Sequence, residues 1–520
     1  MAISAAFASV AAAEARAQVL SAACPLAVRM SLARPTGRCA AAARPLPVAP
    51  SWPTDDGPVS VLPLNLRADV RSAYPMDRDN GALWSGRGAS GSLSWGIQAA
   101  WGPFRAAVQP LLHASENRVF PLPDTAAVGR GRGAYPWAYG QLDWYLRPGT
   151  GRAWGIDPGD SFVEVETPFV RAGVSHERLR WGPARRYPLL FGGTAGGFPH
   201  AYVETSQDLV TYLGTFGGQV LWGRLEESEH FDADPRNDFR LLSALQVRWE
   251  PELVPGLEFS YALARHEPLP RRSIRAGQLV QIVTGDPPDE APDRRGMAMG
   301  TLSGRLVLPG QGVELYGQVG RGEGFLNPQP DVSDNGLARI YLVGLSRTAG
   351  SDEGPRWRIT AEAATQAMEL PQPRNVPAPA VADAPPGHGH THRGQLLGAW
   401  IGPGSNAQYL AFDRLDDAWT WGVFGERVRR DDDTYFRSLA VNYGFRGHDI
   451  EWTLGVRGGG WMDLPAVERI TGPLAFGAEA GVSRRKNRNF TGLRNENWIF
   501  VREWNVWADL YMEWNPRLRP

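Results

Sequence analysis

The chain has 520 residues, a formal net charge of -1, 43% hydrophobic residues, Gly 60 and Trp 20. A nearly neutral charge excludes the broad basic surface typical of nucleic-acid binding, so we expect no nucleic-acid partner. The sequence contains no uninterrupted apolar run of about 18 residues, which excludes a bundle of transmembrane helices. A membrane β-barrel is still allowed, because only alternate residues of its strands face lipid.

Residues 1–58 form a low-complexity tail rich in Ala, Arg and Pro. The tail starts with a short small-apolar run, and "ARA" before Gln18 resembles a signal cleavage site. We therefore expect this tail to be disordered or removed, and residues 59–520 to form one domain. Cys24 and Cys39 both lie in the tail, so the folded part is expected to use neither disulfides nor cysteine metal sites.

A two-residue period then recurs along the chain. Apolar residues occupy every second position between Leu93 and Trp101, and the same spacing follows the "WGPF" turn, which predicts a β-hairpin. Similar alternation occurs in Trp357–Ala363 and Ile450–Val456. Candidate strands, about eighteen within an error of two or so, begin near residues 62, 89, 104, 162, 211, 239, 256, 299, 312, 338, 356, 395, 407, 418, 434, 449, 474 and 500.

The stretch "WNVWADLYMEWN", residues 504–515, shows the pattern most clearly. One set of alternate residues is wholly apolar and begins and ends in tryptophan, whereas the other set is polar or amphipathic. Ten steps at about 3.3 Å, tilted by about 40°, span roughly 25 Å, which is the height of the apolar band of an outer-membrane barrel between its aromatic girdles.

These patterns predict an all-β fold, a closed antiparallel transmembrane β-barrel of about eighteen strands with its lumen plugged by loops. Charged residues at mid-strand require a wide polar lumen, because a dry sandwich core would leave them without partners. The alternative architecture is a soluble array of β-sandwiches. Long loops are expected at 116–160, 182–210, 266–298, 322–337, 368–394 and 484–499.

Two segments resemble a known family. "RLRWGPARRYPLLFGGTAGGFPHAYVET" (178–205) and "LGTFGGQVLWGRLEES" (213–228) are similar to the signature of the capsule assembly Wzi family. "DNGALWSGRG" (79–88) and "HTHRGQLLGAWIGPGS" (390–405) resemble two further family segments. The residues that match the signature are Trp181, Gly182, Pro183, Arg186, Phe198, Pro199, His200, Trp222, Gly223, Arg224, Leu225, Glu226 and Glu227.

The resemblance covers roughly residues 60–520. It implies an outer-membrane barrel of about eighteen strands in a Gram-negative bacterium, and a lectin-like role in attaching or organising capsular polysaccharide. The best-known member also carries a small periplasmic helical bundle, for which this sequence shows no helical pattern.

The block at 178–228 supplies most of the candidate site residues. Its Gly and Pro content is too high for a strand, so we expect 182–200 to fold into the lumen, where Arg185 and Arg186 would face carboxylates such as Glu226 or Glu227. The other interpretation is direct contact with sugar, because aromatic faces stack on pyranose rings and arginine pairs with uronates. The candidates for polysaccharide binding or plugging are Arg180, Trp181, Arg185, Arg186, Tyr187, His200, Trp222, Arg224, Glu226, Glu227, Trp137, Tyr139, Trp144 and Tyr145.

The last four of these candidates form an aromatic cluster, which is either a sugar platform or a hairpin at the membrane interface. His388, His390 and His392 in "HGHTH" are expected to be solvated loop side chains rather than metal ligands. The acidic run "RRDDDT" around 431–433 is expected to be a charged hairpin tip, with calcium binding as the alternative. We expect no metal, no cofactor and no catalytic residue.

The function predicted from the sequence is therefore non-enzymatic association with anionic surface polysaccharide, through many weak contacts. Expected partners are outer-membrane lipid, lipopolysaccharide and that polysaccharide, and the barrel is expected to be a monomer. A porin-like channel for small solutes and a barrel hydrolase are the alternative functions. Motifs such as G-x-S-x-G and H-E-x-x-H are absent from the sequence, but hydrolase triads assembled in space leave no such motif.

Overall fold

The computed structural model describes residues 59–518 except 124–132, 134, 136–141, 232–236, 270–273, 275, 285–296, 323–338, 351–354, 367–387, 417–418, 437–446, 468–469, 492, 495–496, 499 and 515–516. The expectations for residues 1–58, including both cysteines, lie outside the described residues. None of the helices within the described ranges is long and apolar enough to cross a membrane.

The strands form a closed antiparallel barrel with eighteen wall positions. Four positions are each filled by two shorter strands in succession. In pairing order the wall consists of β1 (Val59–Arg71), β2 (Gly88–Trp101), β3 and β4 (Phe104–Val108, Leu111–Ser115), β5 and β6 (Ala153–Asp157, Phe162–Glu166), β7 (Val170–Ser175), β8 and β9 (His200–Thr205, Leu209–Thr211), β10 (Gly214–Glu226), β11 (Phe239–Glu250), β12 (Leu257–Pro268), β13 (Met297–Leu308), β14 (Val313–Gly322), β15 (Arg339–Gly350), β16 (Arg356–Thr365), β19 (Asn406–Leu415), β20 (Trp419–Arg430), β21 (Asp449–Val467), β22 (Ile470–Lys486), and β25 with β26 (Arg502–Trp514, Arg517–Leu518).

The remaining elements lie in the connections. They are the two-residue strands β17 (Thr391–His392), β18 (Gln395–Leu396), β23 (Leu493–Arg494) and β24 (Asn497–Trp498), and the short helices η4 (Ala276–Leu279), α3 (Gln281–Thr284), η6 (Pro309–Gln311), α4 (Asp432–Thr434) and η8 (Arg488–Phe490).

The barrel closes where β1 pairs with β25, from Leu64↔Trp514 to Arg71↔Trp507. At this seam the Arg71 guanidinium donates to Asp509 at 2.7 Å across the two strands. Closure satisfies the backbone groups that an open sheet would expose to lipid, which is the condition for spanning a bilayer with strands.

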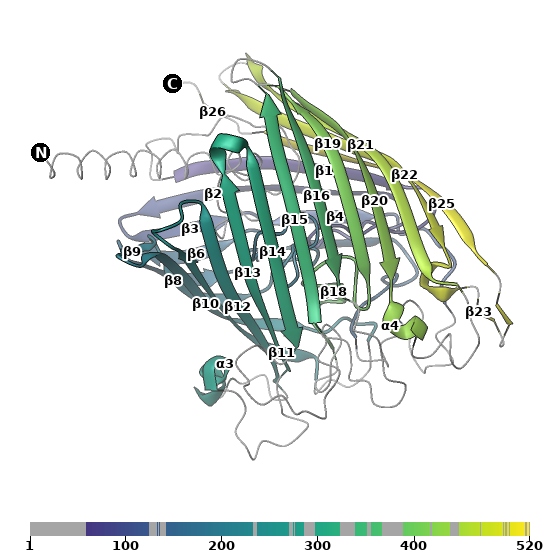
Figure 1. Ribbon diagram of the computed structural model, residues 1–520, viewed down its shortest axis with the longest axis horizontal. Helices are drawn as coiled ribbons and strands as arrows, with labels where there is room; N and C mark the ends of the chain where they lie inside the picture. Colours follow the sequence, from purple (N-terminus) through teal and green to yellow (C-terminus); the bar gives the residue numbers. More distant parts are fainter. Residues whose placement is uncertain are drawn as a thin grey trace, which may run out of the picture.

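Connections alternate strictly between short and long. One end, called the turn end, carries only connections of a few residues, such as 102–103, 212–213 and 416–418. The other end, called the loop end, carries all the long connections, including 116–152, 176–199 and 366–405. Figure 1 shows α3 and α4 at the loop end and η6 and β26 at the opposite end. In outer-membrane barrels the end that carries the long loops usually faces the cell exterior.

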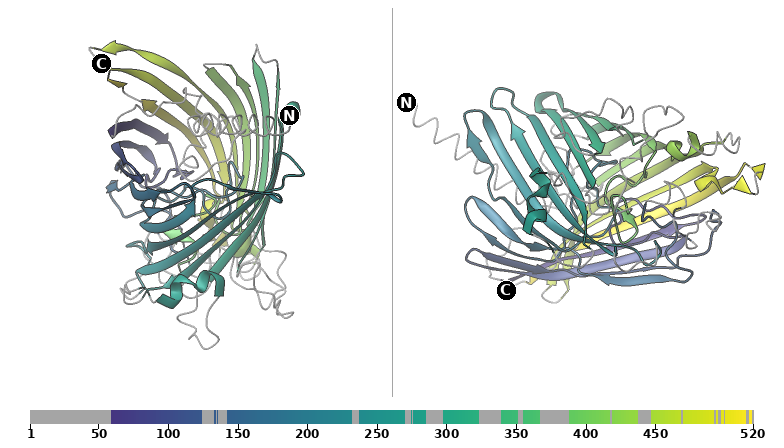
Figure 2. Two further views of the ribbon diagram at one scale, coloured as in Figure 1. Left: turned by 90° about the vertical axis from the view of Figure 1, so that its left-hand side faces the viewer. Right: turned by 90° about the horizontal axis from the view of Figure 1, so that it is seen from below.

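The two faces of the wall have opposite chemistry, as β25 shows. Trp504 and Val506 are 61% and 58% exposed on the outside, whereas Asn505 and Asp509 are buried on the inside. The alternation read from the sequence of this strand is confirmed, because Trp504 and the aliphatic residues face outward, whereas the polar residues and the amphipathic Trp507 and Tyr511 face the lumen. Figure 2 shows the strands curving around this common interior.

The number of wall positions agrees with the expected strand count, but only because two expected strands that do not occur in the wall are offset by two wall strands that were missed. The strand expected near 395 is only the two-residue β18 outside the wall, and the one expected near 434 starts with the short helix α4; residues 437–446 lie outside the described ranges. Conversely, β7 and β8 were missed, because they are short and the latter falls within the loop expected at 182–210.

Candidate functional site

Three connections from the loop end contact one another inside the barrel. They are residues 72–87, 176–199 and 388–405, and we call them together the lumen assembly. The Gly81 amide donates to the Gly193 carbonyl at 3.0 Å, and the Ala195 amide donates to Leu396 at 3.0 Å. The Gln395 amide completes the link by donating to the Gly81 carbonyl at 3.0 Å. Three of the four segments that resemble the family, although distant in sequence, therefore meet in one place.

Arg186 anchors this assembly to the wall. Its guanidinium donates to both oxygens of Glu426 on β20, at 2.9 and 3.2 Å. The Tyr187 hydroxyl donates to the same carboxylate at 2.6 Å, and Arg78 pairs with it at 2.9 Å. Two cations and a phenol on one carboxylate compensate the desolvation of a group only 3% exposed.

A second wall carboxylate accepts hydrogen bonds from backbone amides of the same segment. Glu362 on β16 accepts the amides of Arg185, Arg186 and Tyr187 at 2.7–2.9 Å. These N–H groups belong to irregular chain, so without the carboxylate they would be buried and unpaired. Side-chain and backbone anchors together fix residues 185–187 against the wall.

Arg185 itself pairs with Glu314 on β14. The expectation that Arg185 and Arg186 face lumen carboxylates is correct in kind, but the predicted partners Glu226 and Glu227 are wrong. Wall strands far along the chain supply the real carboxylates, because the segment crosses the lumen instead of turning back on its own neighbours.

Arg180 and Trp181 stabilise the conformation of residues 180–192. Arg180 donates to the carbonyls of Arg185 at 2.6 Å and Gly192 at 3.1 Å, so one guanidinium ties together the two ends of a Gly- and Pro-rich turn. The Trp181 indole donates to Gln219 on β10 at 3.1 Å and packs edge-on against Phe191. Trp181 and Tyr187 are 4% and 0% exposed, so neither ring offers a face to a sugar in this arrangement.

The histidines of "HGHTH" are buried, so the expectation of solvated loop side chains is wrong. His388 pairs with Glu227, and the Glu226 amide donates to His392 at 3.1 Å. His390 lies 2.8 Å from His266 and hydrogen-bonds the Leu190 carbonyl. Burial lowers the pKa of His390 to about 4, even though its bond to that carbonyl acts in the opposite direction.

His200 is a structural member of the same interior. It is 5% exposed, and its ring lies 2.8 Å from the Phe198 carbonyl and beside the Phe198 ring. Within the described ranges, no three His, Cys, Asp or Glu side chains are placed to hold a metal ion.

Four candidates lie at the loop end of β10. Leu221 and Leu225 point into the lumen core, so the alternation sends Trp222, Arg224 and Glu226 outward. The Trp222 indole donates to the Leu279 carbonyl of η4 at 2.9 Å, and Glu226 accepts from Arg224 and from Arg393, each at 2.7 Å. Glu227 instead faces His388, so the block predicted as one site is divided between two faces of the wall.

Trp144 and Tyr145 lie where the loop-end connections pack together. Trp144 packs against Tyr135 at a centroid distance of 4.8 Å, and Tyr145 packs edge-on against Trp84 at 5.1 Å. Both therefore stabilise contacts between loops. Trp137 and Tyr139 lie outside the described residues.

The acidic run at 431–433 is also buried, so the prediction of a charged hairpin tip is wrong. Asp431 accepts from the Tyr135 hydroxyl and, at 3.1 Å, from the Thr434 amide. Burial raises the pKa of Asp431 to about 7, although these donors act to lower it. Asp432 accepts from Arg429 and, at 3.0 Å, from Asn406.

Sequence reasoning missed the partners that matter most, Arg78, Glu362 and Glu426. The only sequence signal for the two carboxylates was that each occupies an inward position of a strand whose outward positions are mostly apolar. That pattern indicates a polar lumen, but it does not identify the loop that fills it.

No family model matches this chain, and no curated protein matches it either. Among solved structures it is similar in fold to Wzi, an outer-membrane protein involved in group 1 capsule assembly in Escherichia coli and titled a carbohydrate-binding β-barrel. The TM-score is 0.55 at 11% identity, over 87% of this chain and 84% of that one. OprD of Pseudomonas aeruginosa matches with a TM-score of 0.42 and 10% identity, over 88% of this chain and 95% of that one.

Proposed function

We propose that this chain is an outer-membrane protein of a Gram-negative bacterium, of the Wzi type, that binds anionic surface polysaccharide at its loop end and catalyses no reaction. The observation that carries the proposal is the lumen assembly. A barrel built to pass solutes needs a continuous aqueous path, whereas here three connections contact one another inside the barrel, and one of them, residues 176–199, is bonded to β10, β14, β16 and β20.

The strength of the anchors supports a permanent closure. Arg186, Arg78 and Tyr187 share Glu426, so moving the segment aside would leave a buried carboxylate without its cations. Breaking such a pair costs about 3–5 kcal/mol in free energy. A segment held by such a pair would open too rarely to act as a gate.

The loop-end rim supplies groups suited to an acidic glycan. Arg224 and Arg393 are about half exposed and share Glu226, and Arg393 also lies 3.8 Å from Asp157. An arginine carries five N–H donors, so these contacts do not use all of them. Arginine forks match carboxylate geometry, so the proposed ligand class is a uronate-containing polysaccharide. Wzi of Escherichia coli, which is similar in fold, is a carbohydrate-binding β-barrel, and this supports a glycan ligand.

Two measurements test the proposal. In planar bilayers the wild-type barrel should show almost no conductance, and deletion of residues 182–200 should open it. Steady conductance of the wild type would favour the porin-like alternative, whatever the deletion variant does.

Binding of alginate, a uronate polymer, should exceed binding of neutral dextran. The double change Arg224→Gln with Arg393→Gln should weaken alginate binding by about tenfold, since each charge-assisted hydrogen bond contributes about 1.5–3 kcal/mol before solvent screening reduces it. Equal binding of both polymers would refute the polysaccharide role. Turnover of a glycan or lipid that one Ser or His substitution abolishes would instead establish the hydrolase.

A further inference from the structure

The outer face of β19–β25 is ordered into horizontal rows by the strand register. In the two outward rows nearest the loop end every residue except Ile450 is polar or aromatic, and the two rows below them are apolar. From the loop end downward, these rows are Asn406, Arg429, Ile450, Lys486 and Arg502; Gln408, Arg427, Trp452, Arg484 and Trp504; Leu410, Gly425, Leu454, Val482 and Val506; and Phe412, Val423, Val456, Ala480 and Ala508.

Four cations of the upper two rows form what we call the outer cation cluster. Within the part of the chain that the structure describes, none of the four makes an ion pair with a carboxylate. By contrast, Arg429 in the same top row pairs with Asp432. The members of the cluster are Arg427, Arg484, Lys486 and Arg502.

Two of the four cations lie against tryptophan rings on the outer face. Arg427 lies over Trp452 at 5.8 Å and Arg484 lies over Trp504 at 5.4 Å. Both indoles are more than half exposed on the outside, where tryptophan marks the level of lipid head groups. Among the described residues, the hydrogen bonds of the Arg427 guanidinium go to the neutral side-chain amides of Asn406 and Gln408, and no carboxylate lies within ion-pair distance of it.

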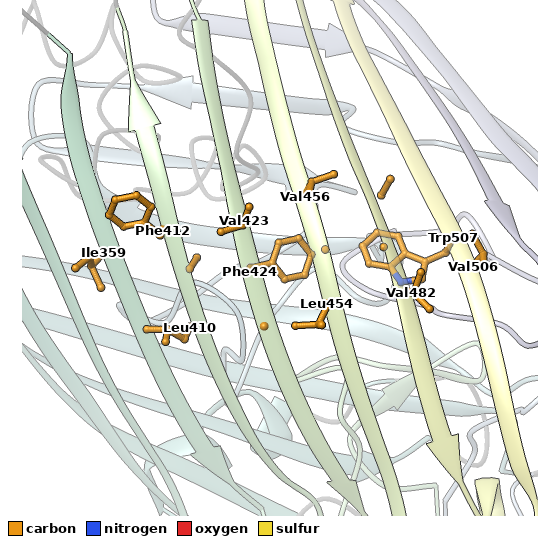
Figure 3. A pocket seen from close by; sticks show the side chains of 15 residues that line it. Ile359, Leu410, Phe412, Val423, Phe424, Leu454, Val456, Val482, Val506 and Trp507 are labelled. Carbon is orange, nitrogen blue, oxygen red and sulfur yellow. The ribbon is translucent and has the colours of Figure 1, made fainter.

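Directly below lies a hollow that we call the outer groove. It measures about 820 Å³, is almost wholly apolar, and follows the outer faces of Leu410, Leu454 and Val482 (Figure 3). Gly425 leaves the hollow open in the middle of an apolar row. Inward neighbours such as Phe424 and Trp507 are buried in the lumen core, so the opening is on the membrane side.

We propose that the outer cation cluster and the outer groove together bind one lipopolysaccharide molecule of the outer leaflet. The cations would contact the phosphates of its lipid A part, and acyl chains would lie in the groove. The inference uses the outer-membrane location of the proposed function, but it does not depend on polysaccharide binding.

The spacing of the rows supports this occupant. Successive outward rows are two residues apart, about 6.8 Å, so the cations lie within about 14 Å above the groove. A phosphorylated, multiply acylated lipid places its charge directly above its chains in the same way. Arginine and lysine both bind phosphate well, and the groove volume lies within the range of about 300–1,000 Å³ typical of ligand sites.

The test measures lipid binding to the full chain in detergent by native mass spectrometry. The probes are hexa-acylated diphosphorylated lipid A, the same lipid without phosphates, and phosphatidylcholine. Diphosphorylated lipid A should bind most tightly, with one copy per barrel. The change Arg484→Gln with Lys486→Gln should weaken it about tenfold, because two charge-assisted contacts are lost.

The matched control is Arg347→Gln with Arg414→Gln, two outward cations at the turn end, which should leave lipid A binding unchanged. Gly425→Phe should fill the groove and weaken lipid A binding about threefold; a Cβ at this position comes no closer than 3.7 Å to a neighbouring atom, the Leu454 side chain. Folding of each variant is checked by the heat-dependent mobility of the barrel in gels.

Equal affinity for phosphorylated and dephosphorylated lipid, an equal loss in the control variant, or a dimer in place of a lipid adduct would each overturn the inference. Alginate binding should be unaffected by Arg484→Gln with Lys486→Gln. Failure of the lipid site and failure of the polysaccharide proposal are therefore distinguishable.

Discussion

Arginines on the two sides of the wall at β20–β25 have different partners. On the inside, Arg186 and Arg485 form bidentate pairs with Glu426 and Asp449. On the outside, Arg484 lies against an indole, and no carboxylate within the described ranges pairs with it. Paired and buried arginines stabilise the fold, whereas the unpaired arginine on the membrane side is one that we propose to bind lipid.

The largest effect should come from breaking the inner network. Glu426→Gln leaves Arg186 and Arg78 buried without their counter-ion, and we expect a loss of about 3–5 kcal/mol in the free energy of unfolding. Urea unfolding in lipid vesicles, followed by tryptophan fluorescence, measures it. The control Glu252→Gln, at an exposed turn, should change stability by less than about 0.5 kcal/mol. Equal stability of the two variants would show that the network is dispensable.

The buried histidine adds a pH dependence to the inner region. The pKa of folded His390 is about 4, below the ordinary 6.5, so the folded state binds its proton less readily than the unfolded state. The stability that His390 contributes should therefore be complete above pH 6.5 and fall as the pH drops toward 4, by up to about 3 kcal/mol. Burial also lowers the pKa of His200 to about 4, so His390→Gln should reduce the slope in this window without abolishing it. Unfolding titrations measure the slope, and an unchanged slope would assign the dependence to the other groups.

A charge-conserving substitution compares the inner and outer faces of the wall directly. Arg186→Lys keeps the charge but loses the bidentate geometry toward Glu426, and it should destabilise the barrel by about 1–3 kcal/mol. The matched outer change Arg484→Lys should alter stability by less than about 0.5 kcal/mol, because no bidentate pair is lost. The same unfolding measurement serves both variants, and similar losses in the two would remove the distinction between the faces.

The smallest effect should be that of Arg484→Gln on stability in detergent without added lipid. Its guanidinium is not part of an ion pair among the described residues, so we expect a change within about 0.5 kcal/mol. Adding diphosphorylated lipid A should raise the melting temperature of the wild type more than that of the variant, because a ligand stabilises the form it binds. A large loss without lipid would instead mark Arg484 as a structural residue.

The wall of this barrel is readable from the sequence, because a period of two with one apolar face is a local signal. Even so, β7 and β8 escaped detection, since six residues are too few to show a clear alternation. The site is far less readable. Arg186 and Glu426 are 240 residues apart, and no local pattern pairs a loop cation with one wall carboxylate among many.

The histidines and the aspartates at 431–433 show the same limit from the other direction. Polar, Gly-rich surroundings indicate an exposed loop, but these loops fold into the barrel, so the side chains are buried by strands that sequence proximity does not reveal. The outer cation cluster, in contrast, follows from strand register alone and needs no knowledge of the loops.

The pairing of β1 with β25 has a consequence for how the molecule is made. The residues joined by the Arg71–Asp509 bond are 438 apart, so the barrel cannot close before β25 has been synthesised. Contacts this distant in sequence form slowly. Until β1 and β25 pair, each would be an open strand edge that can pair with another chain, so the last step of folding also removes the main site for aggregation.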